Sequence, residues 1–295
     1  MGLHPQGTSR PRIAGKGTSV AMIDVTFRAA RPCADSRMHR QHSRVLAMVV
    51  VAAVAATSIG PARADPPSFD RPGIGFASAV LPAGSVAWEQ GLPDWQRGQD
   101  AGITTTQWSA DTLFRVGLTP TLELQLSGSP WNRVVSSGGG IHDHAEGAGD
   151  SAIGLKWAPS LASKNWSLAV LGVIGLATGA RAFTAGTTVT SLGVAATDDL
   201  GNNRSFEVYG NVDHAAGRNT LTLAANFGFP IHGDISGFAE VGHVAGGGLT
   251  QSLLGGGLTW MLHERVQFDL YADRGLTRRG TDALAGFGIS VFFGK

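Results

Sequence analysis

The chain has 295 residues, of which 42 are glycine and 15% are charged, and its formal net charge is +1. Because binding to nucleic acid requires a basic stripe that meets the phosphates, the near-neutral charge excludes that class of function. The glycine content lacks the Gly-X-Y period of collagen and favours turns and close-packed strands. Cys33 is the only cysteine, which rules out an internal disulfide and a zinc site built from cysteines.

The N-terminal region has the three parts of a secretory signal peptide. A basic stretch precedes the apolar run from Val45 to Ile59, and the small-residue sequence Ala62-Arg63-Ala64 follows it. A transmembrane anchor is the alternative, but a spanning helix needs about 20 apolar residues and this run is shorter. We therefore expect residues 38–64 to be a signal peptide that directs export and is cleaved after Ala64.

The residues before Met38 show no sustained periodicity and are rich in Arg, Gly, Ser and Pro. Since Met38 stands directly before the basic stretch, we expect translation to begin there and residues 1–37 to be a misassigned upstream extension. The mature chain would then begin near Asp65, with residues 65–83 forming a periplasmic N-terminal lead. An alternative for this lead is that residues near Phe76 to Leu81 plug the lumen or pair with the C-terminal strand.

Beyond the lead, apolar and polar side chains alternate with a period of two, which is typical of half-buried strands. Between Trp108 and Leu118, for example, Phe114 and Val116 share the apolar face, and Arg115 lies on the polar one. The alternation recurs in segments of about ten residues. Twelve strands are predicted, near residues 84–92, 104–118, 121–134, 149–158, 165–178, 187–200, 204–214, 219–229, 235–244, 249–262, 265–274 and 283–293.

The length of these strands separates two architectures that share the alternation, the soluble sandwich and the membrane barrel. Soluble strands average about five or six residues, whereas a tilted membrane-spanning strand needs about 9 to 11. The predicted strands are mostly of the longer kind. We therefore predict an all-β fold, a closed antiparallel transmembrane β-barrel of about 12 strands over residues 84–293, with its apolar faces against outer-membrane lipid.

The connections alternate between short periplasmic turns and longer outer loops when the N-terminus is placed in the periplasm. The longest outer loops are predicted at Pro93 to Ile103 and at Gly128 to Ala148. An even number of strands returns the C-terminus to the periplasm. The last strand, Ala285 to Phe293, ends in an aromatic residue through which we expect the barrel-assembly machinery to recognise the chain, although Gly294 and Lys295 follow it.

The order of several motifs along the mature chain resembles one known family. Arg71-Pro72-Gly73-Ile74-Gly75-Phe76 comes first and Val86-Ala87-Trp88-Glu89-Gln90-Gly91-Leu92-Pro93 second, and Gly149-Asp150-Ser151-Ala152-Ile153-Gly154-Leu155-Lys156-Trp157 and Gly237-Phe238-Ala239-Glu240-Val241 follow. They are similar to the family described as Putative MetA-pathway of phenol degradation, over nearly all of residues 70 to 293. The resemblance implies an outer-membrane transporter-like barrel, linked to aromatic compounds through neighbouring genes. It supplies no catalytic or substrate-binding residues.

Ionisable side chains on the polar faces are predicted to face the lumen, because an Arg or Lys on the lipid face costs about 2 to 4 kcal/mol at the membrane mid-plane. Two roles are open for them: a selectivity lining that sorts permeants by charge, or an ion-pair network that fills a narrow barrel. Seven are acidic and two are basic, so an open lumen would disfavour anions. The lumen-lining candidates are Asp111, Arg115, Glu123, Lys156, Glu207, Asp213, Glu240, Asp269 and Asp273.

Other site chemistry finds little support in the sequence. His142-Asp143-His144 and Glu146 lie in the longest predicted loop, but a glycine-rich loop enforces no ligand geometry, so we predict no metal and no cofactor. The sequence has no G-x-S-x-G, P-loop, dinucleotide or H-E-x-x-H motif, so we predict no catalytic residues and no enzyme activity. A membrane hydrolase would need a base beside a nucleophile, for which His214 and His243 are available.

Three functions are compatible with these sequence features. The preferred one is a porin-like transporter or channel for passive passage of small, aromatic or apolar molecules across the outer membrane. The second is a non-transporting structural or surface-interaction barrel whose loops, such as Gly128 to Ala148, meet partners. The third is an outer-membrane hydrolase. Channel conductance favours the first, a folded but silent barrel the second, and ester hydrolysis lost on replacing one His the third.

Overall fold

The structure is a computed structural model that describes residues 14–15, 25–26, 67–246, 248–277 and 280–294. The predicted signal peptide, residues 38–64, lies outside the described residues. In the upstream region only the short strands β1 (Ala14–Gly15) and β2 (Val25–Thr26) are described, and they pair with each other. Within the described ranges, no helix is long and apolar enough to cross a membrane.

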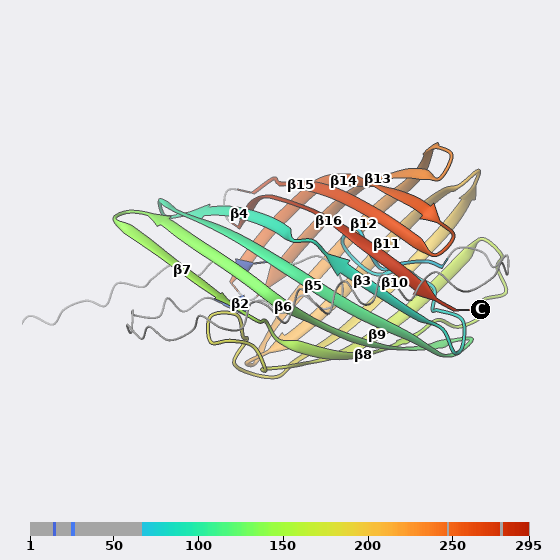
Figure 1. Cartoon of the computed structure of the whole chain (residues 1–295), viewed down its shortest axis with the longest axis horizontal. Coiled ribbons are helices and arrows are strands. Elements are labelled where there is room, and N and C mark those ends of the chain that lie inside the picture. Colours follow the sequence, from blue (N-terminus) through green and yellow to red (C-terminus); the bar gives the residue numbers. More distant parts are fainter. Residues whose placement is uncertain (1–13, 16–24, 27–66, 247, 278–279, 295) are drawn as a thin grey trace, which may run out of the picture.

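Fourteen further strands form one antiparallel sheet that closes on itself (Figure 1). Closure comes from the last strand of this sheet, β16, which pairs with both β3 and β4. The strands are β3 (Val86–Gly91), β4 (Asp94–Asp100), β5 (Ile103–Thr119), β6 (Leu122–Gly138), β7 (Ile141–Gly147), β8 (Ser151–Trp157), β9 (Trp166–Leu176), β10 (Val189–Gly201), β11 (Arg204–Ala215), β12 (Arg218–His232), β13 (Ile235–Gly246), β14 (Leu249–His263), β15 (Val266–Gly275) and β16 (Thr281–Phe293).

Two positions in the barrel wall are each filled by two short strands in succession. β3 and β4 both pair with β5 and β16, and they are separated at Leu92-Pro93, where proline has no N–H for a ladder. β7 and β8 likewise both pair with β6. The wall therefore has twelve positions, and the predicted closed antiparallel barrel of about 12 strands is confirmed.

Two segments that we predicted to be outer loops are mostly strand, so this part of the prediction is wrong. Pro93 to Ile103 contains β4, and Gly128 to Ala148 contains the end of β6 and all of β7. A wall that rises beyond the membrane is wet on both faces, so its strands lose the alternation on which the prediction relied. Positive φ angles at Ala101-Gly102 and Gly139-Gly140 close the two hairpins tightly.

The wall has an apolar outer face and a largely polar inner face, as a membrane barrel requires. Large apolar side chains such as Leu192, Leu254 and Phe287 are exposed on the outer face, at 59%, 53% and 53%. Arg115 and Lys156 face inward and are fully buried. The distribution is the reverse of a soluble sandwich, in which apolar side chains would meet in a core.

The residues that precede β3 run inside the barrel, and we call residues 67–85 the lumen segment. The N–H of Leu81 donates to Glu123 Oε2 of β6 at 2.8 Å, and the N–H of Ile74 donates to Glu240 Oε2 of β13 at 2.7 Å. β6 and β13 stand on opposite sides of the twelve-position wall, so the segment crosses the whole lumen.

This placement corrects the prediction that residues 65–83 form a periplasmic lead. Residues 69–81 lie in the barrel interior instead, which agrees with the alternative for Phe76 to Leu81. The physical reason is charge: the inner wall carries ionised side chains that need partners, and Asp70 and Arg71 of the segment supply them. Periodicity along the sequence does not reveal complementarity between distant residues.

Candidate functional site in the barrel interior

The centre of the interior is an ion-pair network around Arg115 of β5. Its Nε lies 2.8 Å from Glu123 Oε1 on β6, and its Nη1 lies 3.0 Å from Glu89 Oε1 on β3. Nη1 also lies 3.3 Å from Asp70 Oδ1 of the lumen segment. All four side chains are fully buried. The guanidinium presents a planar set of donors that can serve several carboxylates at once, so it suits this central position.

A second cation, Lys156 of β8, joins the lumen segment to the same network. Its Nζ lies 2.7 Å from Asp70 Oδ1 and 3.7 Å from Glu123 Oε1. It also donates to the carbonyl oxygen of Ala77 at 3.2 Å. Lys156 thus holds the lumen segment at two points, the side chain of Asp70 and the backbone carbonyl of Ala77.

Arg71 of the lumen segment contacts the part of the wall around the closing strand, on β4 and β15. Its Nη1 and Nη2 donate to the two carboxylate oxygens of Asp94 on β4, at 3.1 and 3.2 Å. Nη2 also lies 3.3 Å from Asp269 Oδ1 on β15, and the backbone carbonyl of Arg71 accepts a bond from Gln267 Nε2 at 3.0 Å. This fork-to-carboxylate pairing is the strong, directional form of an ion pair.

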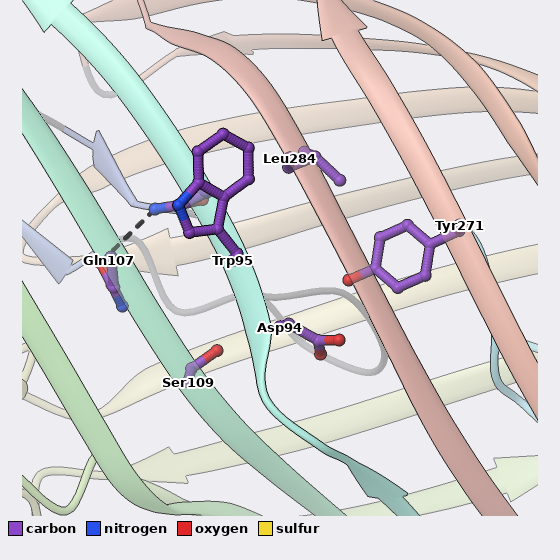
Figure 2. A pocket seen from close by; sticks show the side chains of 7 residues that line it. Asp94, Trp95, Gln107, Ser109, Tyr271 and Leu284 are labelled. Atoms are coloured by element: carbon purple, nitrogen blue, oxygen red, sulfur yellow. Dashed lines mark hydrogen bonds between the residues drawn. The ribbon is translucent and has the colours of Figure 1, made fainter.

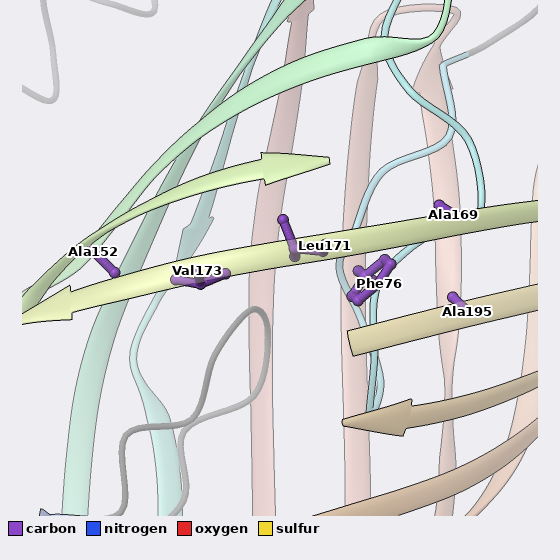
Figure 3. Packing of buried hydrophobic residues seen from close by; sticks show 6 residues of the cluster. All are labelled: Phe76, Ala152, Ala169, Leu171, Val173 and Ala195. Carbon is purple, nitrogen blue, oxygen red and sulfur yellow. The ribbon is translucent and has the colours of Figure 1, made fainter. Parts of the chain in front are cut away.

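An aromatic ring of the segment covers an apolar part of the inner wall. Phe76 belongs to a buried apolar cluster with Ala152, Ala169, Leu171, Val173 and Ala195 of β8, β9 and β10 (Figure 3). Its ring meets Tyr209 edge-on at a centroid distance of 5.4 Å, and Lys156 Nζ lies 5.1 Å from its centroid. The lumen therefore contains both charged and apolar surfaces, and the lumen segment touches each.

A small pocket lies beside the Arg71 contacts and draws on β4, β5, β15 and β16. Figure 2 shows Asp94, Ser109 and Tyr271 around it, together with Trp95 and Leu284. Gln96 Nε2 on β4 donates to Gln107 Oε1 on the neighbouring β5 at 3.4 Å, and both residues line the pocket. Its lining mixes hydroxyl, amide and carboxylate groups with apolar side chains, and its space is that of about one water molecule.

The sequence of this barrel and its lumen segment matches one known protein family. The family model described as Putative MetA-pathway of phenol degradation matches residues 69–293, which is most of the chain. The chain belongs to this family. The match begins at residue 69, inside the lumen segment, so the family model covers most of this segment as well as the wall. Comparison with curated proteins found no significant match.

Solved structures share the fold of this family member. An outer-membrane channel from Pseudomonas putida F1 superposes with a TM-score of 0.57 at 14% identity, covering 73% of this chain and 98% of that one. The β domain of the Bordetella autotransporter BrkA gives a TM-score of 0.52 at 10% identity, covering 71% of this chain and 100% of that one. At these identities the likeness concerns the outer-membrane barrel fold alone.

The predicted lumen-lining residues all lie on the inner side of the wall, in four groups. Arg115, Glu123 and Lys156 form the central network, and Asp269 pairs with Arg71. Glu240 holds the lumen segment at Ile74. The others bond within the wall: Glu207 accepts from Thr197 at 3.0 Å, Asp213 from Asn211 at 2.9 Å and Asp111 from Ser109 at 3.4 Å, while Asp273 lies against Gly255.

Four charged members of the interior were not predicted from the sequence: Asp70, Arg71, Glu89 and Asp94. Glu89 lies on the polar face of a predicted strand and could have been included by the same alternation. Asp94 escapes prediction because its strand lacks the alternation of a half-buried strand, and Asp70 and Arg71 escape it because they precede the barrel. Whether any member of the interior selects permeants stays a prediction.

The histidines singled out in the sequence lie away from this interior. His142 and His144 are exposed on β7, and the described ranges contain no group of three metal-binding side chains. His214 bonds Asn219 Oδ1 at 2.7 Å and His243 bonds Ser252 Oγ at 2.9 Å, both at exposed positions. In the part of the chain that the structure describes, no carboxylate or amide is hydrogen-bonded to His243, so the pair lacks the third group that orients a catalytic base.

Proposed function

We propose that this family member lets small apolar or phenolic molecules cross the outer membrane passively. The observation that carries the proposal is the seat of Phe76, an aromatic ring resting on an apolar surface inside a membrane barrel. A ring that belongs to the lumen segment, and not to the wall, occupies that surface. When the segment shifts, the wall offers the same surface to a free aromatic molecule.

The chemistry of the seat suits a phenol in particular. A Cβ added to Gly193 would lie 2.9 Å from Phe76 Cε1, so the lack of a side chain there makes room for the ring. Tyr209 supplies an edge-on aromatic contact, and the Lys156 ammonium beside the ring can donate a hydrogen bond to a phenolic oxygen. The outer-membrane channel from Pseudomonas putida that shares the fold agrees with passage as the function.

Uptake of labelled phenol by intact cells that lack their own major porins tests the proposal. Cells that express the chain should accumulate phenol faster than cells that do not. Leu171→Glu, which places a charge on the ring's seat, should return uptake to the background rate. Leu192→Val, a change on the lipid face, should leave it unchanged.

A folded barrel that passes no small solute in single-channel and liposome-swelling measurements would contradict the proposal and favour the non-transporting barrel. We also propose that the protein is not an enzyme. His243→Ala therefore should not change ester hydrolysis by purified barrel, and a loss of hydrolysis in that variant would support the membrane hydrolase instead.

We propose further that residues 38–64 direct export, that residues 1–37 are not translated, and that β16 presents the aromatic end that the barrel-assembly machinery reads. These proposals are supported by the signal-peptide pattern and by the C-terminal Phe292-Phe293. N-terminal sequencing of outer-membrane protein should give a start near Asp65. A peptide mapping upstream of Met38 would contradict the assigned start.

A further inference from the structure

Arg71 occupies a recess that the wall of the barrel builds from four strands. Its guanidinium pairs with both oxygens of Asp94 on β4 and with Asp269 on β15. The ring of Tyr271 on β15 lies 6.0 Å from the guanidinium carbon, within the range of a cation–π contact. Asp94 and Asp269 are 5% and 0% exposed at their side chains, so the recess is closed to water while Arg71 fills it.

Glycines of the wall shape the recess around the guanidinium. A Cβ added to Gly288 would lie 2.6 Å from Arg71 Nε, and one added to Gly91 would lie 3.1 Å from Arg71 Nη1. A Cβ added to Gly286 would overlap Asp94 Oδ1. The wall therefore has no side chain at three points where one would fill the space of the cation or of its carboxylate partner.

The residue that fills the recess is not part of the wall. Around Arg71 the lumen segment forms no strand, so movement of the segment out of the lumen breaks no strand pairing of the barrel. Departure of Arg71 would leave the neighbouring carboxylates of Asp94 and Asp269 without a cation, and like charges this close repel each other. Asp269 Oδ2 already lacks a hydrogen-bond partner. A mobile cation with the same donors would relieve this repulsion.

We propose that Asp94, Asp269 and Tyr271, with the recess left by Gly91, Gly286 and Gly288, form a binding site for small guanidinium-bearing cations, and that Arg71 is its tethered occupant. A planar fork of N–H donors matches the two oxygens of Asp94, which a cation without donors does not. Binding at the site and docking of the lumen segment exclude each other. The proposal goes beyond passage of phenolic molecules, and it holds whether or not they pass.

Ligand-dependent stability of Arg71→Ala tests the site. The folded barrel, reconstituted in phospholipid vesicles, is heated in methylguanidinium chloride or in tetramethylammonium chloride at equal concentration. At about 10 mM salt, where a guanidinium salt has almost no denaturing effect, methylguanidinium should raise the unfolding midpoint of Arg71→Ala by at least about 2 °C over tetramethylammonium. It should give no such rise in the wild type. Arg71→Ala/Asp94→Asn should lose the difference. Equal midpoints in the two salts for Arg71→Ala would overturn the proposal.

A second measurement uses the wild-type chain, in case Arg71→Ala does not fold. Methylguanidinium competes with Arg71 for the recess, so it should accelerate chymotryptic cleavage after Phe76 in the folded barrel. Tetramethylammonium, which has the same charge and no donors, should not. Equal cleavage rates in the two salts would overturn the proposal, because a free guanidinium would then not replace the tethered one.

Discussion

At the scale of single residues, buried charge in this barrel is stable because it is grouped. Arg115 and Lys156 meet the carboxylates of Asp70, Glu89 and Glu123 within 3.7 Å, and no member of the set is exposed. Removing one cation leaves the remaining buried carboxylates with too little positive charge around them, which is costly in the interior. The energetic role of each residue therefore depends on which partners remain.

Lys156→Met is expected to destabilise the folded barrel by about 3 to 5 kcal/mol, because Asp70 loses its shortest ion pair, at 2.7 Å. Urea unfolding of protein refolded into phospholipid vesicles measures the change. Lys164→Met, at an exposed position, is the matched control and should stay within about 0.5 kcal/mol of the wild type. Equal stability of the two variants would show that the network does not hold the lumen segment.

Gly288 tests the docking of Arg71 from the side of the wall. In Gly288→Val the new side chain would enter the space of the Arg71 guanidinium, because its Cβ alone would lie 2.6 Å from Nε. The lumen segment should then be cleaved by chymotrypsin after Phe76 several-fold faster than in the wild type. Gly172→Val, where an added Cβ meets nothing within 4 Å, should not change the rate. Slow cleavage in both variants would mean that Arg71 is not needed to keep the segment docked.

At the scale of elements, the sequence predicts the strands well where lipid and lumen impose opposite polarity on the two faces. β11 and β15 follow the alternation, and their inward Asp213 and Asp269 could be placed from it. β4 and β7 could not be predicted because they stand where both faces are polar. The lumen segment could not be placed either, since its fit to the wall depends on pairs such as Arg71 and Asp94, which local patterning does not encode.

A disulfide between the lumen segment and the wall tests whether passage requires movement of this element. Ser78 Oγ lies 2.6 Å from Ser167 Oγ of β9, close enough for cysteines to bond. Ser78→Cys/Ser167→Cys should therefore conduct less when oxidised than the wild type, and a reductant should restore conductance. Each single cysteine variant is the control. Equal conductance of the oxidised and reduced forms would mean that permeants pass beside the docked lumen segment and that passage does not require its movement.

At the scale of the whole molecule, closure decides how the chain meets the membrane. β16 pairs with β3 from Phe293 to Gly288 and with β4 from Ala285 to Thr281, so the barrel has a continuous seam between its ends. A closed sheet leaves no strand edge unpaired in lipid. The same seam brings Asp94 on β4 next to β15 across β16, so the Arg71 recess forms only in the closed barrel.

Closure should be visible as heat-modifiable mobility on gels. A barrel whose sheet closes on itself resists detergent at room temperature and unfolds only on heating, so unboiled protein from the outer-membrane fraction should run faster than boiled protein. Phe287→Asp, which puts a charge on the lipid-facing side of β16, should reduce the fast band, whereas Phe287→Leu should preserve it. A single mobility before and after boiling, in a soluble periplasmic fraction, would contradict a closed membrane barrel, and the exposed apolar face would then need another partner.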